Sequence, residues 1–428
     1  MTELTETRPM GVRDVLRIRD YRSLFLGQAV SDIGDGITLL LVLLVINELT
    51  GSMVALAIMA IAEAVPAFTV GLVAGVYVDR WDRRRIMLAS DLLRAGIVLS
   101  FAFVQTPVLL PLMYVLGFAQ ASVATFFRPA RGALLPHIVP KEGLPAANSL
   151  AQASMVIGGV IGAGIAGLIF TAFGTGILGF ALDAGTFLVS FAFVLTISPA
   201  AGRIDRTTEV AERATRNVVQ SLGEGLAIIR RSRVLAGSLL AAAVTMLGLG
   251  AVNVLFVPLL MNDLEVEATW MAGIDFAQTA GMLLAAGLVT WLATRLRATT
   301  IITIALAGIG VCIGTLAGID QVWQVLIVLF VAGLLVTPLQ AMLQTIVQTS
   351  GTDATRGRVV SLLQASMSTA SVASMALGGV FGELIGIRGV FLASGVIVLM
   401  AAGVALLMFR GTADEPAAAP RIRAGEAA

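Results

Sequence analysis

Twelve stretches of apolar residues, each long enough to cross a lipid bilayer, recur along this chain of 428 residues. A helix needs about 20 apolar residues to span the hydrocarbon core of a membrane. The stretches occupy residues 23–46, 54–78, 86–105, 108–127, 147–171, 176–197, 234–260, 269–293, 299–318, 323–347, 360–386 and 388–409. Hydrophobic residues make up 57% of the chain and charged residues only 13%, which excludes an ordinary soluble fold. The sequence therefore predicts an all-α integral membrane protein with twelve transmembrane helices.

The polar segments divide the chain into two bundles of six helices. The long polar segment in the middle contains Val218, Val219, Leu222, Leu226 and Ile229 at helical spacing, so we expect part of it to form an amphipathic helix. The predicted organisation is a cytoplasmic N-terminal segment (1–22), an N-terminal bundle (23–198), a cytoplasmic linker (199–232), a C-terminal bundle (233–409) and a disordered cytoplasmic tail (410–428).

An internal repeat supports this division. Residues 149–155 read SLAQASM and residues 361–367 read SLLQASM, an offset of 212 residues, about half of the chain. In the same two apolar stretches small residues recur at every fourth position, which favours close helix packing. These residues are Gly158, Gly162 and Ala166 in the first stretch and Gly378, Gly382 and Gly386 in the second. The pattern predicts two parallel six-helix halves with a substrate site between them.

The distribution of positive charge predicts the orientation. If both termini are cytoplasmic, 26 of the 28 Lys and Arg residues fall in cytoplasmic segments, Arg388 alone falls in an outer loop, and Arg94 lies inside a span. Positive residues concentrate on the cytoplasmic side of membrane proteins. We therefore expect a multi-pass protein of the cell membrane with both termini in the cytoplasm.

The composition excludes several classes of function. The net charge is +1, so there is no basic surplus for binding nucleic acid. Cys312 and His137 are the only residues of their kinds, which leaves no material for a metal cage or a His-based catalytic dyad, and there is no Gly-rich phosphate loop for ATP. We expect neither an enzyme nor a bound cofactor, and the energy source would be a proton gradient.

Acidic residues inside the apolar stretches are the first candidates for function, because an ionised carboxylate is costly in a membrane. Asp32 and Asp35 lie near the middle of the first stretch and share one helical face with Gln28. Glu63 lies three residues before Pro66 in the second stretch. We predict proton coupling by Asp35, Asp32 and Glu63, with a structural hydrogen-bonding role for the aspartates as the alternative.

Other charged residues are weaker candidates. Asp183 and Asp275 lie nearer the outer ends of their stretches, and Asp91 has Arg94 one helical turn away. We expect Asp91 and Arg94 to form an ordinary local ion pair. No stretch contains an arginine at mid-depth by this interpretation, which argues against a dedicated pocket for anionic substrates.

The loop between the second and third stretches reads GVYVDRWDRRR over residues 75–85. It resembles the cytoplasmic loop motif Gly-x-x-x-Asp-Arg-x-Gly-Arg-Arg of the major facilitator superfamily, with Asp82 in place of the second glycine. Gly75 would allow close helix approach. The resemblance implies that Asp79 latches onto the start of the eleventh span when the cytoplasmic side is closed. The gating residues would be Gly75, Asp79, Arg80, Arg83, Arg84, Arg356 and Arg358.

Further stretches resemble the macrolide-efflux-like branch of that superfamily. They are Leu26-Gly27-Gln28 with Gly34-Asp35-Gly36, Ala62 to Pro66, Phe127 to Arg131, Leu182 to Ala184 and Arg356 to Val359. Gln120 matches the drug-antiporter motif of the fourth span, but Gly117 stands where that motif has its arginine. The resemblance implies export of hydrophobic, often cationic, compounds in exchange for protons.

We expect alternating access by a monomer whose partners are a small hydrophobic substrate, protons and the lipid bilayer. The predicted substrate cavity is lined by Gln28, Met113, Gln120, Asn253, Gln278, Gln340 and Gln344. One alternative keeps the fold and changes the substrate to a siderophore or a lysophospholipid. A more remote alternative is a membrane sensor that transports nothing.

Overall fold

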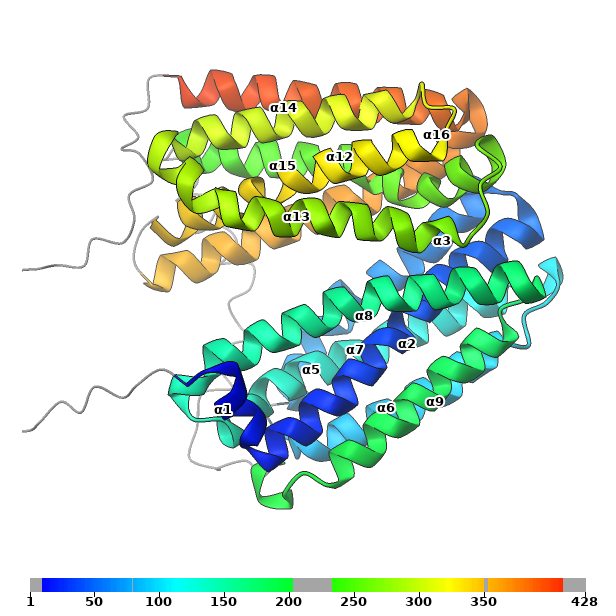
Figure 1. The fold of residues 1–428 in the computed structure, drawn as a ribbon, viewed down its shortest axis with the longest axis vertical. Helices are drawn as coiled ribbons and strands as arrows, with labels where there is room; N and C mark the ends of the chain where they lie inside the picture. Colours follow the sequence, from blue (N-terminus) through cyan, green and yellow to red (C-terminus); the bar gives the residue numbers. More distant parts are fainter. Residues whose placement is uncertain (1–9, 79, 203–232, 350–352, 411–428) are drawn as a thin grey trace, which may run out of the picture. The chain divides into compact units, whose positions relative to one another are not determined.

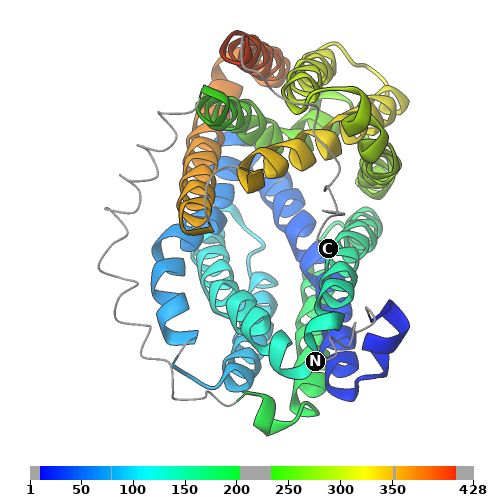
Figure 2. The same ribbon diagram turned by 90° about the vertical axis from the view of Figure 1, so that its left-hand side faces the viewer.

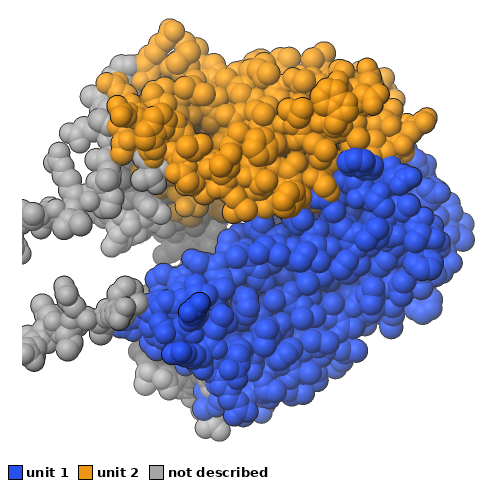
Figure 3. All heavy atoms as spheres, in the orientation of Figure 1, with its two compact units in different colours: residues 1–212, 267–272 blue, residues 213–266, 273–428 orange. Residues whose placement is uncertain are grey.

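A computed structural model describes residues 10–78, 80–202, 233–349 and 353–410 of the chain, and over these residues the protein is nearly all helical. The chain divides into two compact units (Figure 3). Unit 1 comprises Met1–Glu212 and Glu267–Ala272, and unit 2 comprises Arg213–Val266 and Gly273–Ala428. Nine helices within the described ranges are long and apolar enough to cross a membrane. The predicted linker helix and the predicted C-terminal tail lie outside the described residues.

The helices of unit 1 are connected by short turns (Figure 1). They are α1 (Val12–Arg17), α2 (Arg19–Thr50), α3 (Met53–Ala64), α4 (Pro66–Thr69), α5 (Gly71–Val78), α6 (Arg83–Phe101), α7 (Leu110–Ile138), α8 (Leu144–Phe173) and α9 (Ile177–Leu195), with short 3₁₀ helices η1 (Pro107–Leu109), η2 (Lys141–Gly143) and η3 (Pro199–Gly202). The helices of unit 2 are α12 (Arg233–Pro258), the π-helical turn η5 (Leu259–Asp263), α13 (Trp270–Arg295), α14 (Ala298–Leu316), α15 (Val322–Thr349) and α16 (Asp353–Phe409).

Turn residues account for several helix boundaries. α2 ends at Thr50 and is followed by Gly51, whose φ of 58° is the left-handed conformation that glycine adopts without strain. The next residue, Ser52, caps α3 by accepting a hydrogen bond from the amide of Ala55 over 3.3 Å. Pro66 then opens a new helix at its first position, so the predicted second span is divided into α3, α4 and α5.

Two predicted boundaries differ from the structure. The fourth apolar stretch was expected to end at residue 127, but α7 continues to Ile138, so Arg128 and Arg131 lie in a helix and not in a loop. The last two stretches form one element, α16, which is interrupted at Gly386 by a non-helical backbone with φ 77° and ψ 164°. Glycine tolerates this conformation because it has no Cβ.

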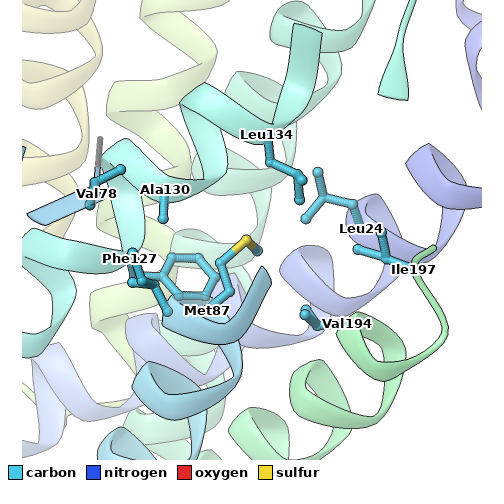
Figure 4. Packing of buried hydrophobic residues seen from close by; sticks show 9 residues of the cluster. Leu24, Val78, Met87, Phe127, Ala130, Leu134, Val194 and Ile197 are labelled. Carbon is cyan, nitrogen blue, oxygen red and sulfur yellow. The ribbon is translucent and has the colours of Figure 1, made fainter. Parts of the chain in front are cut away.

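In unit 1, α2 packs against α8 and α9, and α6 packs against α7 and α9. In Figure 1, α2, in blue, runs lengthwise through the unit, and Figure 2 shows the helices from their ends. One apolar cluster joins the helix ends near the loop after α5 (Figure 4). It consists of Leu24, Val78, Ile86, Met87, Phe127, Ala130, Leu134, Val194 and Ile197. Through this cluster, α2 and α6 both pack against α7 and α9.

Close backbone contacts occur between α2 and α8 in unit 1 and between α12 and α16 in unit 2. A Cβ atom at Gly36 would lie 2.9 Å from the carbonyl oxygen of Gly159, and one at Gly250 would lie 2.6 Å from that of Ser371. Because real Cβ atoms do not approach so closely, only glycine fits at either position. The repeat that is visible in the sequence thus has a matching helix crossing in each unit.

One detail of this crossing differs between the units. In unit 1, Gly162 lies against the carbonyl of Ile33 and the amide of Ile37 on α2. In unit 2 the equivalent position is Ser374, whose hydroxyl accepts from the amide of Ala251 over 2.8 Å and donates to the carbonyl of Leu247 over 2.5 Å. An amide and a carbonyl four residues apart are partners in a regular α-helix. The Ser374 hydroxyl therefore bonds to both members of one amide–carbonyl pair in the α12 backbone.

Candidate functional site

Three polar residues that were predicted to share one face of α2 interact with three different helices of unit 1. Arg131 Nη1 of α7 donates a hydrogen bond to Gln28 Oε1 over 3.0 Å. Ser154 Oγ of α8 donates to Asp32 Oδ2 over 2.6 Å. Asp35 forms an ion pair with a residue of α6. This face of α2 is therefore a polar seam inside a largely apolar bundle.

Arg94 of α6 lies at the centre of this seam. Its Nη2 atom pairs with Asp35 Oδ1, and its side chain is only 8% exposed, against 43% for Asp35. Its guanidinium carbon lies 4.1 Å from the centre of the Phe187 ring, at cation–π distance. With its amide oriented to satisfy both groups, Gln120 accepts from Arg94 Nε over 3.1 Å. One guanidinium thus joins α2, α6, α7 and α9.

Two predictions about this arginine are wrong. Arg94 was expected to pair locally with Asp91, but its partner is Asp35 on another helix, and Asp91 Oδ2 instead accepts a hydrogen bond from Ser190 Oγ over 2.8 Å. The spans were also expected to hold no arginine at mid-depth. Arg94 is buried and reaches Asp35, halfway along α2, so unit 1 does contain an internal cation.

Asp183 of α9 lies beside this ion pair and is fully buried. Thr38 Oγ1 of α2 donates a hydrogen bond to Asp183 Oδ2 over 2.5 Å, and Thr186 Oγ1 lies 3.0 Å from Asp183 Oδ1. A Cβ atom at Gly34 would collide with both Asp183 Oδ1 and Thr186 Oγ1. Gly34, next to Asp35, therefore makes the room in which the Asp183 carboxyl group lies.

The spacing of polar residues on α9 explains why they meet α2 and α6 together. Asp183, Phe187 and Ser190 stand at i, i+4 and i+7, and therefore share one face of the helix. Two polar residues, Asp183 and Ser190, on one face of an apolar helix are a signal that could have indicated the site from the sequence. Asp183 was considered only as a secondary candidate, and Ser190 was not considered.

The two glycines that flank Asp35 recur in unit 2. Gly34 contacts α9 and Gly36 contacts α8, while Gly248 contacts Ser394 and Gly250 contacts Ser371, on the two parts of α16. Between the second pair of glycines stands Leu249 in place of the aspartate. The packing role of the glycines is thus duplicated, whereas the acidic residue is present in unit 1 alone.

Glu63, the third predicted coupling residue, lies apart from the Arg94 cluster. It is half-buried on α3 and makes no hydrogen bond or ion pair with a described residue. Gly117 of α7 faces it, because a Cβ there would lie 3.7 Å from Glu63 Cγ and would collide with Met59. Met113, predicted to line the cavity, is fully buried on the same helix and therefore serves packing in this conformation.

The remaining predicted cavity residues belong to unit 2. Asn253 of α12 is exposed and Gln278 of α13 is half-buried. On α15, Gln340 and Gln344 are both exposed. The surfaces of these four residues are accessible in unit 2 taken by itself.

The predicted gating motif forms a tight turn between α5 and α6. Asp82 caps α6 by accepting from the amide of Arg85 over 2.9 Å, so the aspartate that replaces the motif glycine has a structural role. Arg84 donates to the carbonyls of Val194 over 3.1 Å and Leu195 over 2.7 Å at the end of α9. Cations are favourable at that end of a helix.

Other residues of the motif make fewer contacts. Arg83 Nη1 lies 3.0 Å from Nε2 of His137, and Arg80 is exposed. A Cβ at Gly75 would meet no described atom within 4 Å, and the predicted close helix approach there stays a prediction. Asp79 and the side chains of Arg356 and Arg358 lie outside the described residues, so the predicted latch stays a prediction.

Within the described ranges, no group of three or more His, Cys, Asp or Glu side chains could hold a metal ion. The titratable groups that unit 1 brings together are the buried guanidinium of Arg94 and the carboxyl groups around it.

Comparisons with known proteins agree on the kind of protein. Macrolide efflux protein A of Streptococcus pyogenes is 26% identical over 385 residues, which cover 89% of this chain and 93% of that protein. Multidrug efflux pump Tap of Mycolicibacterium fortuitum is 28% identical over 391 residues, covering 88% and 92%. A bacterial homologue of the iron transporter ferroportin, in an inward-facing state, has a similar fold, with a TM-score of 0.72 at 17% identity over 92% of this chain and 99% of that one.

The family model described as transmembrane secretion effector matches residues 14–424, nearly the whole chain. This match agrees with the helical fold, the duplicated halves and the loop motif. The chain is a membrane transporter that belongs to the transmembrane secretion effector family of the major facilitator superfamily.

Proposed function

We propose that the protein exports hydrophobic, often cationic, compounds from the cytosol in exchange for protons, by alternating access. The observation that carries this proposal is the ion pair between Asp35 and Arg94 inside unit 1. A proton on Asp35 would remove the negative partner of Arg94. Because the guanidinium also contacts α7 and α9 through Gln120 and Phe187, loss of the pair would alter the packing of four helices. Protonation and helix packing would thus be coupled.

The relatives support the direction and the substrate class. Two of them are named as a macrolide efflux protein and a multidrug efflux pump, and each aligns with most of this chain. The proton gradient would supply the energy. In this proposal both termini lie in the cytoplasm, and the substrate enters from that side.

The proposal is tested in a bacterium that lacks its own drug pumps. Cells that express the protein are loaded with ethidium or a labelled macrolide, and efflux is followed with and without a protonophore. We expect efflux that the protonophore abolishes, and that is lost in Asp35→Asn at equal expression. Efflux that is unchanged in Asp35→Asn would overturn the coupling role of this residue.

A matched control exists in unit 2. Asp320 also pairs with an arginine, because Arg388 Nη2 lies 3.0 Å from Asp320 Oδ1, but the Asp320 side chain is 74% exposed. Asp320→Asn removes the same charge without touching the cluster in unit 1. We expect its efflux to match that of the unaltered protein.

A second candidate substrate is an amphiphile with an anionic headgroup, such as a lysophospholipid. The observation in its favour is Arg131, a half-buried cation on α7 that binds Gln28, a predicted cavity residue. Transport of a labelled lysophospholipid into inverted vesicles tests it. We expect Arg131→Gln to abolish this transport if the headgroup binds there, and transport equal to that of the unaltered protein would exclude such a role.

A further inference from the structure

The cluster around Arg94 contains more acids than cations. Asp35, Asp91 and Asp183 meet there from α2, α6 and α9, whereas Arg94 is the one basic side chain among the described residues that contact them. Asp91 and Asp183 are both fully buried. Asp35 already neutralises the arginine. Two further ionised carboxylates would leave uncompensated charge in a dry interior, where such groups neutralise instead.

Hydrogen counting at Asp183 leads to the same conclusion. Thr186 Oγ1 lies 2.7 Å from the backbone carbonyl oxygen of Asp183 and 3.0 Å from its Oδ1 atom. A threonine hydroxyl has one hydrogen, and a carbonyl can only accept. If that hydrogen goes to the carbonyl, the contact with Oδ1 needs a hydrogen from the carboxyl group. Thr38 donates to the other oxygen, Oδ2. A neutral Asp183 therefore satisfies every contact that the carboxyl group makes.

Asp91 provides an independent observation. Its Oδ2 atom accepts from Ser190, but its Oδ1 atom is buried and has no hydrogen-bond partner among the described residues. Arg94 is one turn away on the same helix and is directed to Asp35 instead. An unpartnered oxygen is far less costly on a neutral carboxyl group than on an ionised one. The unpartnered oxygen therefore favours a protonated, neutral Asp91.

We infer that Asp91 and Asp183 each hold a proton while Asp35 is paired with Arg94, so that unit 1 contains a two-proton store beside the ion pair. The store is electrically neutral as a whole. The groups that face it are Asp35 from α2, Arg94 from α6 and Gln120 from α7. This inference goes beyond the proposed function, because it holds for any substrate, and its test needs none.

Infrared spectroscopy of the purified protein in lipid vesicles tests the store directly. A protonated carboxyl group has a carbonyl stretch that an ionised one lacks, and this band shifts when hydrogen is exchanged for deuterium. Spectra are recorded near neutral pH for the unaltered protein and for Asp91→Asn, Asp183→Asn and Asp35→Asn. We expect each of the first two variants to lose a carboxylic-acid band and Asp35→Asn to lose none.

Two outcomes would overturn the inference. One is a spectrum of Asp183→Asn or Asp91→Asn with the same carboxylic-acid intensity as the unaltered protein, and the other is loss of a band in Asp35→Asn alone. If Asp183→Asn does not fold, Thr186→Val serves instead, because it removes the hydroxyl that faces Asp183 Oδ1 and keeps the side-chain shape. A neutral Asp183 predicts a shifted band in this variant, and an ionised Asp183 predicts an unchanged carboxylic-acid region.

Discussion

Arg94 of α6 forms its ion pair with Asp35 of α2, although Asp91 stands one turn away on its own helix. The pair connects two helices that are far apart in the sequence, and Arg94 adds contacts to two more through Gln120 and Phe187. A local pair would have stabilised only α6. The observed pair makes the packing of the bundle depend on the charge of one carboxyl group.

The first prediction concerns the coupling energy of this pair. Arg94→Gln, Asp35→Asn and the double variant form a thermodynamic cycle, measured by thermal unfolding in detergent. We expect a coupling energy of about 0.5–3 kcal/mol, since residues in one charged network typically couple by that amount. Additive effects of the two substitutions would show that the pair contributes nothing to stability.

The same cycle on Arg388 and Asp320 provides the comparison. Both side chains of that pair are exposed, at 40% and 74%. Exposed ion pairs contribute about 0.2–1 kcal/mol and are screened by salt. We expect this smaller coupling to disappear in high salt, while that of Arg94 and Asp35 largely persists. Equal salt dependence of the two pairs would show that the burial of Arg94 does not shield the first pair from salt.

The second prediction concerns Gly34. In Gly34→Ala the new Cβ collides with the Asp183 carboxyl group and the Thr186 hydroxyl. We expect a loss of about 1–3 kcal/mol in the free energy of unfolding, typical of overpacking. Gly96→Ala is the control, because a Cβ there meets nothing within 4 Å. Equal thermal stability of the two variants would show that Asp183 can move aside freely.

The third prediction compares the duplicated crossings. Gly36→Ala and Gly250→Ala each place a methyl group against a backbone carbonyl of the facing helix, that of Gly159 or that of Ser371. Backbone atoms cannot rotate away as side chains can, so we expect both variants to be destabilised, by about 1–3 kcal/mol each. Thermal unfolding against Gly403→Ala, whose added Cβ has open space, measures this. A neutral effect at either position would show that the crossing in that unit is loose.

The fourth prediction concerns Ser374. In Ser374→Ala the amide of Ala251 and the carbonyl of Leu247 lose the hydroxyl that bridges them. We expect a loss of about 0.5–1.5 kcal/mol, the net value of a typical hydrogen bond. Ser122→Ala on α7 is the control, because that exposed hydroxyl only donates to a carbonyl of its own helix. An unchanged free energy of unfolding in Ser374→Ala would mean that the amide of Ala251 and the carbonyl of Leu247 do not need the hydroxyl as a partner.

Hydrophobic pattern was sufficient to predict the fold class. The apolar stretches lie in helical segments, although the second is divided into three helices and the last two form one element, because backbone groups in a membrane must be satisfied within the helix itself. Helix ends were harder to predict. The extension of α7 past residue 127 depends on Pro129 and Pro136 being accommodated inside a helix, and proline usually argues against that.

The candidate site was predictable only in part. Asp32 and Asp35 were identified because a carboxylate in an apolar stretch is unusual wherever it points. Their partners were not identified, because pairing across helices depends on which faces meet. The sequence places Asp91 nearer to Arg94 than Asp35, and only the packing of α6 on its neighbours reverses that order.

The ion pair also has an electrical consequence. Asp35 and Arg94 together carry no net charge, so the membrane voltage exerts no net force on them while they are paired. A proton on Asp35 leaves Arg94 with an uncompensated positive charge inside the bundle. Carrying one elementary charge across the whole membrane at 100 mV is worth ~2.3 kcal/mol. The pair itself would thus respond to the membrane voltage only while Asp35 is protonated.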